Sequence, residues 1–161
     1  AVILGHLRGQ SIFSFSNTEG LEKLSLTIPT DSIPEGIAQF TLFSSKGEPL
    51  CERLVFVDNP RERARLSIST DKSTYAARQK VSVTLELKDQ AGNPLKAMVS
   101  ATVTDKQSVY WGKYGQDIRS YLLLQADLPG YIEDPAYFFV EENATRRQLL
   151  DMLMLTHGPM M

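Results

Sequence analysis

Apolar and polar residues alternate along much of the first two thirds of the chain. A period of two places neighbouring side chains on opposite faces of a β-strand, so that one face is buried and the other meets water. Three segments follow this pattern, with apolar residues at Leu24, Leu26 and Ile28, at Val81, Val83, Leu85 and Leu87, and at Val99, Ala101 and Val103. Each is expected to be a strand, and the row from Val81 to Leu87 is expected to face the core.

One turn sequence occurs twice. Residues 47–50 read GEPL and residues 92–95 read GNPL, and an apolar residue, Leu42 or Leu87, stands at the same distance before each. Glycine adopts a positive φ without steric cost, and proline fixes φ where the return strand begins and needs no backbone donor. Both segments are therefore expected to be hairpin corners. The alternative is a binding loop at the end of a sandwich.

Turn sequences, including these two, separate the β segments. They read TEG, DSIPEG, SKGEP, DNPRER and AGNP, and each holds the Gly, Pro, Asn or Asp residues that tight turns require. Short strands separated in this way favour an antiparallel sandwich. This part of the chain is therefore expected to be mainly β.

The composition changes after Asp105. Residues 117–125 predict a short helix capped by Asp117. Its apolar side would hold Ile118, Tyr121, Leu122 and Gln125. The next segment, LPGYIEDPAYFF, is rich in aromatic residues, Pro and Gly. It is expected to cover apolar surface without forming a regular element.

A further helix is predicted near the end of the chain, in NATRRQLLDMLMLTHG. Asn143 is its expected N-cap and Gly158 its expected C-cap. An apolar stripe on this helix consists of Leu149, Leu150 and Leu153. Such a stripe is expected to pack on a sandwich face or to mediate self-association, so these three leucines are candidate interaction residues. Asn143 also begins an Asn-Ala-Thr acceptor for N-glycosylation, a pattern too short to outweigh its capping role.

Composition and charge narrow the functional classes. The 161 residues are 42% hydrophobic and 22% charged, which is typical of a folded globular chain. A net charge of −2 and no cluster of Lys and Arg argue against nucleic acid as a partner. No apolar run is long enough to span a membrane, and no signal peptide is recognisable. The apolar beginning, AVIL, and the apolar end, LMLTHGPMM, are expected of a fragment cut from a longer chain.

Motifs that would carry catalysis are missing from the sequence. His6 and His157 have no neighbouring ligands at metal-site spacing, and Cys51 is expected to be a buried strand thiol. The carboxylate pairs Glu141-Glu142 and Asp31-Glu35 are expected on solvated surface. No nucleophile elbow, phosphate loop or zinc motif occurs. We therefore expect no enzyme, no catalytic residue, no metal and no cofactor.

Three aromatic residues, Tyr110, Trp111 and Tyr114, form a separate candidate site. Aromatic side chains suit half-wet surfaces, so the cluster could face a carbohydrate or a protein partner. Packing in the core or between domains is the alternative, and the sequence leaves both open.

Residues 68–106 resemble the opening strands of macroglobulin-like domains in α2-macroglobulin-type proteins. They read ISTDKSTYAARQKVSVTLELKDQAGNPLKAMVSATVTDK. Four flanking segments resemble parts of large envelope proteins of Bacteroides-type bacteria. They read LGHLRGQ, IPEGIAQFTLFSSKGEPLCERLVFV, DIRSYLLLQADLPGYIEDPAYFF and RRQLLDMLMLTHG. In those proteins macroglobulin-like domains precede a carboxypeptidase-regulatory-like and a TonB-receptor plug-like domain. Ala76-Ala77-Arg78 replaces a Pro-Gly pair common in the family, and the family's thioester motif is absent.

The resemblance implies a domain organisation. Residues 1–57 would be the C-terminal strands of one macroglobulin-like sandwich, and residues 58–63 a linker. Residues 64–110 would be the N-terminal strands of a second sandwich, and residues 111–161 an aromatic and helical extension. The implied fold class is mainly β, with immunoglobulin/macroglobulin-like antiparallel sandwich strands and a short α-helical C-terminal extension.

The same resemblance implies a non-enzymatic structural or protein-interaction module of a bacterial cell-envelope protein, linked to TonB-dependent outer-membrane transport. Its partners would be other domains of the parent chain, another envelope protein or a second copy. Its location would be the periplasm or the outer-membrane surface. Two alternatives remain: a fragment of an α2-macroglobulin-type protease inhibitor that lacks the thioester, and a carbohydrate-binding sandwich.

Overall fold

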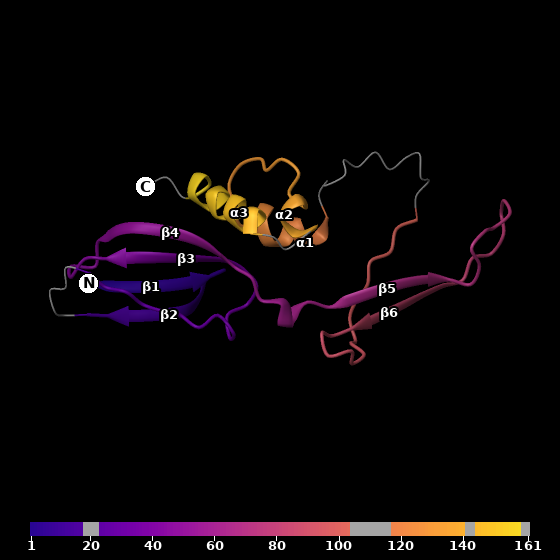
Figure 1. Cartoon of the computed structure of the whole chain (residues 1–161), viewed down its shortest axis with the longest axis horizontal. Coiled ribbons are helices and arrows are strands. Elements are labelled where there is room, and N and C mark those ends of the chain that lie inside the picture. The colour runs from indigo at the N-terminus through magenta and orange to yellow at the C-terminus, as the bar shows by residue number, and fades with distance from the viewer. Residues whose placement is uncertain (18–22, 104–116, 141–143, 159–161) are drawn as a thin grey trace. The chain divides into compact units, whose positions relative to one another are not determined.

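A computed structural model describes residues 1–17, 23–103, 117–140 and 144–158 (Figure 1). The chain forms two compact units. The first unit combines Ala1–Asp58 with Asp105–Met161, and the second is Asn59–Thr104. The first unit is therefore discontinuous in sequence, because its N-terminal and C-terminal parts are separated by the whole of the second.

A four-stranded antiparallel sheet forms the N-terminal part of the first unit. Its strands are β1 (Val2–Leu7), β2 (Gln10–Ser16), β3 (Gly36–Phe43) and β4 (Pro49–Val57). Their order across the sheet is β2-β1-β3-β4. The expectation of a β-rich chain with antiparallel strands is confirmed.

The strand predicted around Leu24, Leu26 and Ile28 is wrong, because the structure gives residues 23–30 no strand pairing. Ile28 packs against a buried cluster on the sheet, while Leu24 and Leu26 remain exposed. The cluster consists of Leu7, Ile33, Ala38 and Val57. An alternating pattern indicates which side chains of a segment share a face. A strand also needs a neighbouring strand that pairs with its backbone N–H and C=O groups, and the pattern does not indicate one.

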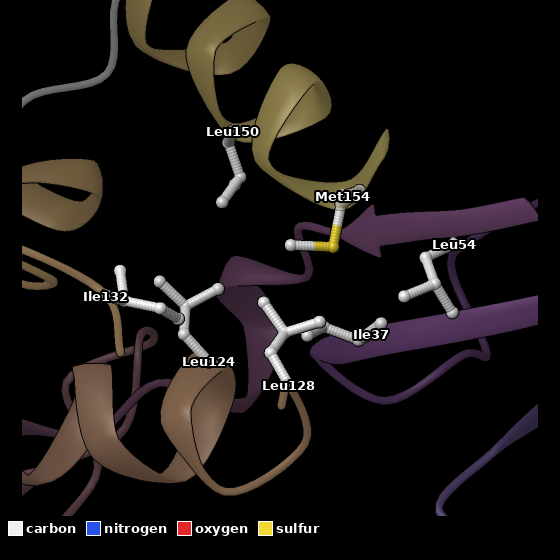
Figure 2. Close-up of a cluster of buried hydrophobic side chains, with 7 residues drawn as sticks. All are labelled: Ile37, Leu54, Leu124, Leu128, Ile132, Leu150 and Met154. Atoms are coloured by element: carbon white, nitrogen blue, oxygen red, sulfur yellow. The ribbon is translucent and has the colours of Figure 1, made fainter. Parts of the chain in front are cut away.

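A helical segment packs on this sheet (Figure 1). Its helices are α1 (Ile118–Ser120), the π-helix η2 (Tyr121–Gln125), α2 (Tyr137–Val140) and α3 (Ala144–Thr156). The packing is mainly of η2 against β3 and of α3 against β4. Figure 2 shows the resulting core, in which side chains from the sheet and from the helical segment point toward one another. Ile37 and Leu54 come from the sheet, and the helical segment contributes Leu124, Leu128, Ile132, Leu150 and Met154. Within the described part of this unit the layer on the sheet is thus helical, and no second sheet faces it.

The predicted cap of the first helix is correct, but the predicted buried side is wrong. Asp117 accepts a hydrogen bond from the Ser120 amide at 2.7 Å, and the Ser120 hydroxyl accepts one from the Asp117 amide at 3.0 Å. Ile118, Tyr121 and Leu122 are exposed, whereas Leu124 is fully buried. Both sides of this segment are apolar, so the pattern alone could not show which one meets the sheet.

The aromatic segment after the π-helix covers apolar surface, as expected. Phe138 and Phe139 pack against the core, and the Phe139 ring meets the ring of Phe56 on β4 at 5.8 Å between centroids. Its last residues nevertheless form the short helix α2. The ends of α3 agree with the predicted helix, although its expected cap, Asn143, lies outside the described residues.

Among the described residues, arginine–carboxylate pairs join the sheet part of the first unit to its helical part. The pairs are Arg8–Asp127 at 2.9 Å, Arg53–Asp151 at 2.7 Å, Arg119–Glu35 at 3.0 Å and Arg147–Asp58 at 3.9 Å. Most of these side chains are partly exposed, and exposed pairs contribute about 0.2–1 kcal/mol each. They surround the apolar core and favour one orientation of the helices on the sheet.

The second unit contains a two-stranded antiparallel sheet. Its strands are β5 (Arg65–Thr70) and β6 (Val83–Lys88), and the 3₁₀-helix η1 (Pro60–Glu62) precedes them. Residues 96–103 form no strand, so the strand predicted at Val99, Ala101 and Val103 is wrong. After the turn, pairing is limited to a bridge between Lys88 and Pro94 and a hydrogen bond from the Leu95 amide to the Leu87 carbonyl at 2.9 Å.

The two repeated turns have the same backbone structure. Gly47 and Gly92 both have a positive φ, at 81° and 88°. In the first turn the Ser44 amide donates to Glu48 O at 2.8 Å and the Gly47 amide to Ser44 O at 3.1 Å. Asp89 takes the place of Ser44 in the second turn, and the corresponding distances are 2.9 and 3.1 Å. The two turns match, as predicted, but only the first is a full hairpin corner between paired strands, β3 and β4. After the second turn the predicted return strand is limited to the bridge between Lys88 and Pro94.

Candidate interaction surfaces

The two-stranded sheet of the second unit has one apolar face and one polar face. Opposite residues of an antiparallel pair share a face, and the pairs Leu66/Leu87, Ile68/Leu85 and Thr70/Val83 alternate with polar pairs. We call the surface formed by Leu66, Ile68, Thr70, Val83, Leu85 and Leu87 the ribbon face. The opposite face carries Arg65, Ser67, Ser69, Thr84, Glu86 and Lys88.

The ribbon face is exposed. The exposed fractions are 48% for Leu66, 65% for Ile68, 54% for Val83 and 41% for Leu85. The prediction that the row from Val81 to Leu87 faces the core is therefore wrong for this chain. The strand and its two faces were predicted correctly, but the second unit has no layer, among its described residues, that covers the apolar one.

Helix α3 carries apolar residues on two sides. Leu150 is buried in the core and Leu153 packs against it. Leu149, Met152 and Leu155 follow one another at intervals of three and are 38%, 59% and 62% exposed. This outward stripe is not part of the buried core, so the structure separates the three predicted interaction leucines: Leu149 is exposed, and the other two hold the helix on the sheet.

The aromatic candidates Tyr110, Trp111 and Tyr114 lie outside the described residues. The paired carboxylates Glu141 and Glu142 lie outside them as well.

The residues considered for chemistry lie apart from one another. Cys51 is exposed on β4, so the prediction of a buried thiol is wrong. The residue lies near the hairpin end of β4, which is an edge strand of the sheet, and few neighbouring groups cover it there. His157 follows α3 and its Nδ1 lies 3.0 Å from the Thr156 hydroxyl. His6 is on β1. In the parts of the chain that the structure describes, no three His, Cys, Asp or Glu side chains come together as a metal site would require.

Shifted carboxyl pKa values occur in the turns and on the polar face of the second unit. The Tyr75 hydroxyl and the Ser82 amide donate to Asp71 at 2.7 and 2.9 Å and lower its pKa. The Lys88 ammonium, 2.9 Å from Glu86, lowers the pKa of that carboxyl. The Asp71 contacts stabilise a turn, and the Glu86–Lys88 contact lies within the single strand β6.

Comparison of the chain with protein-family models, with curated proteins and with solved structures found no match in any of the three. No helix in the described ranges combines the length and the hydrophobicity of a membrane span.

Proposed function

We propose that this chain is a non-enzymatic structural and protein-interaction module of a bacterial cell-envelope protein. The ribbon face is the observation that carries the proposal, because it has no charged residue and four of its apolar side chains, Leu66, Ile68, Val83 and Leu85, are more than 40% exposed and could be buried by a partner. The cover we propose is the apolar face of a second β-sheet, which would complete an immunoglobulin- or macroglobulin-like sandwich with β5 and β6.

Burial would stabilise such an arrangement. Fully burying a Val, Leu or Ile side chain contributes about 1.5–3 kcal/mol, so covering the four half-exposed residues contributes on the order of 3–6 kcal/mol. The area is nevertheless small. Two strands of six residues cover roughly 200 Å², whereas each partner in a stable complex buries about 800 Å². The proposed partner is therefore a neighbouring domain of a parent chain, held close by covalent connection, rather than a freely diffusing copy.

The envelope location and the link to TonB-dependent transport rest on the resemblance of the sequence to envelope proteins with macroglobulin-like domains. A protease-inhibitor fragment would use the same sandwich strands but could not trap a protease covalently, because the thioester motif is absent. A carbohydrate-binding role would depend on Tyr110, Trp111 and Tyr114.

Paired lysine substitutions on the two faces of the ribbon test the proposal. Ile68→Lys with Leu85→Lys changes the ribbon face, and Ser67→Lys with Thr84→Lys adds the same charge to the opposite face. In a parent protein that carries this chain, the first variant should lower the melting temperature by several degrees, and the second should leave it within about one degree. Equal effects of the two variants, or no effect of either, would show that the ribbon face has no partner.

A further inference from the structure

A pocket of about 300 Å³ lies in the first unit, on the face of the sheet that the helices partly cover. It is formed by the strands, by the turn between β1 and β2 and by the residues after η2. Its lining consists of His6, Arg8, Gly9, Ile37, Gln39, Leu54, Ala126 and Asp127. Nothing in the proposed interaction role uses these residues.

The floor of the pocket is a row of side chains across three adjacent strands. His6 on β1 is opposite Gln39 on β3, and Gln39 is opposite Leu54 on β4, so the three share one face. Ile37 and Leu54 are buried and provide an apolar base. Neither the His6 ring nor the Gln39 amide hydrogen-bonds another group within the described ranges, so both present donors and acceptors to whatever enters.

One wall is an ion pair with no net charge. The Arg8 Nε atom donates to Asp127 Oδ2 at 2.9 Å, and Arg8 Nη2 donates to the Leu122 carbonyl. Arg8 and Gly9 have φ values of 47° and 79°. A two-residue hairpin turn with both φ values positive favours Asn-Gly, so an arginine in the first place has a conformational cost. The contacts of its side chain to Leu122 and Asp127 offset that cost and fix the wall.

Two irregularities of the backbone lie beside the same pocket. The pairing of β1 with β2 shifts register between Gly5 and His6, next to the floor residue His6. The π-helix η2 ends immediately before Ala126 and Asp127. Bulges of both kinds interrupt regular hydrogen bonding and occur frequently at functional sites, where they direct side chains.

We propose that this pocket binds a small uncharged group that combines an apolar body with a carboxamide head. The apolar body would contact Ile37 and Leu54, and the amide would donate to and accept from Gln39 and His6. A charged ligand is disfavoured because Arg8 and Asp127 already neutralise each other. The volume lies at the lower end of the range for ligand pockets, which suits a group of amino-acid size.

A titration followed by amide resonances of the ¹⁵N-labelled chain tests the proposal, with isovaleramide as the probe. Saturable shifts with a millimolar dissociation constant are expected at His6, Gln39 and Ala126. Two probes of the same shape serve as controls: 4-methyl-2-pentanone lacks the donor, and isovalerate carries a charge. Both should bind at least tenfold more weakly.

Variants connect the signal to the pocket. Gln39→Leu should weaken isovaleramide binding at least tenfold, and Gln10→Leu, an exposed position outside the pocket, should leave it unchanged. If Gln39→Leu does not fold, His6→Ala carries the same expectation. Three results would overturn the proposal: isovaleramide shifts that do not saturate, 4-methyl-2-pentanone binding as tightly as isovaleramide, or isovaleramide binding the pocket variant as tightly as the wild type.

The carboxamide could belong to a free small molecule or to an Asn or Gln side chain of a partner. A capped Gly-Gln-Gly peptide distinguishes these sources. Tighter binding of the peptide than of isovaleramide identifies a side chain of a partner protein, and weaker binding identifies a free amide.

Discussion

At the scale of single residues, Ser44 and Asp89 close the two equivalent turns with different chemistry. The Ser44 hydroxyl accepts hydrogen bonds from the amides of Lys46 and Glu48 at 3.1 and 3.2 Å. The Asp89 carboxylate accepts one from the Asn93 side chain at 3.0 Å and one from the Asn93 amide at 2.8 Å. Only the second turn therefore depends on an ionisable group.

The pKa of Asp89 is lowered from its ordinary value of 3.8, mainly by the side-chain hydrogen bond from Asn93 and then by the Asn93 amide. A carboxyl with a lowered folded-state pKa contributes stability above its unfolded pKa, and the contribution is lost as pH falls through the folded value. We expect the Asp89 turn to weaken below pH 3.8, with the Ser44 turn unaffected.

Measuring the Asp89 carboxyl titration by NMR should give a midpoint below 3.8. Asn93→Ala removes the side-chain donor and should raise that midpoint toward the ordinary value. A wild-type midpoint at or above 3.8, or one that Asn93→Ala does not move, would contradict the assignment.

At the scale of elements, α3 holds the helical layer on the sheet through one of its two apolar sides. Met154 is 1% exposed and lies in the core with Leu150, while Met152 on the opposite side is 59% exposed. Arg53–Asp151 and Arg147–Asp58 flank the buried side. The helix is thus oriented by a narrow set of contacts, although its composition would allow either side to be buried.

Two methionines on this one helix provide a matched comparison. Met154→Ala removes buried atoms and leaves a cavity, so it should lower the free energy of unfolding by about 2–5 kcal/mol. Met152→Ala changes an exposed side chain and should cost less than about 0.5 kcal/mol. Denaturant unfolding of the two variants checks both values, and similar losses would mean that α3 packs on the sheet through a different side.

At the scale of the whole molecule, the first unit is assembled from two segments that are distant in sequence. Residues 1–58 supply the sheet and residues 117–158 supply its helical cover. The core cluster and the ion pairs seen among the described residues connect them without involving the second unit. The connection through the second unit is therefore not needed to hold the two segments together.

Cleavage of the chain in the second unit tests this conclusion. A site for a sequence-specific protease, inserted between the exposed residues Lys96 and Ala97, divides the sheet segment from the helical segment. After cutting, the two fragments should still elute together in size-exclusion chromatography under native conditions. Met154→Asp in the same background places a charge in the core and should release them. Separate elution of the unmodified fragments would show that the shared core is too weak to hold them.

Features that depend on a few neighbouring residues were predictable from the sequence. The glycines at 47 and 92 require a positive φ, and Asp117 caps its helix, because each depends on backbone geometry within about four residues. Alternation over residues 83–88 specified a strand with one apolar and one polar face, since a strand has a period of two whatever surrounds it.

What only the tertiary structure decided is which apolar surfaces are covered and which distant residues meet. Leu124 is buried and Ile118 exposed, although both are apolar, and β6 keeps its apolar face uncovered. The pocket joins His6, Gln39 and Asp127 from three separate stretches of chain. Periodicity shows how apolar residues are distributed along one element. Burial and site formation depend on which other element packs against it. The choice of packing partner is set by the free energy of the whole assembled unit.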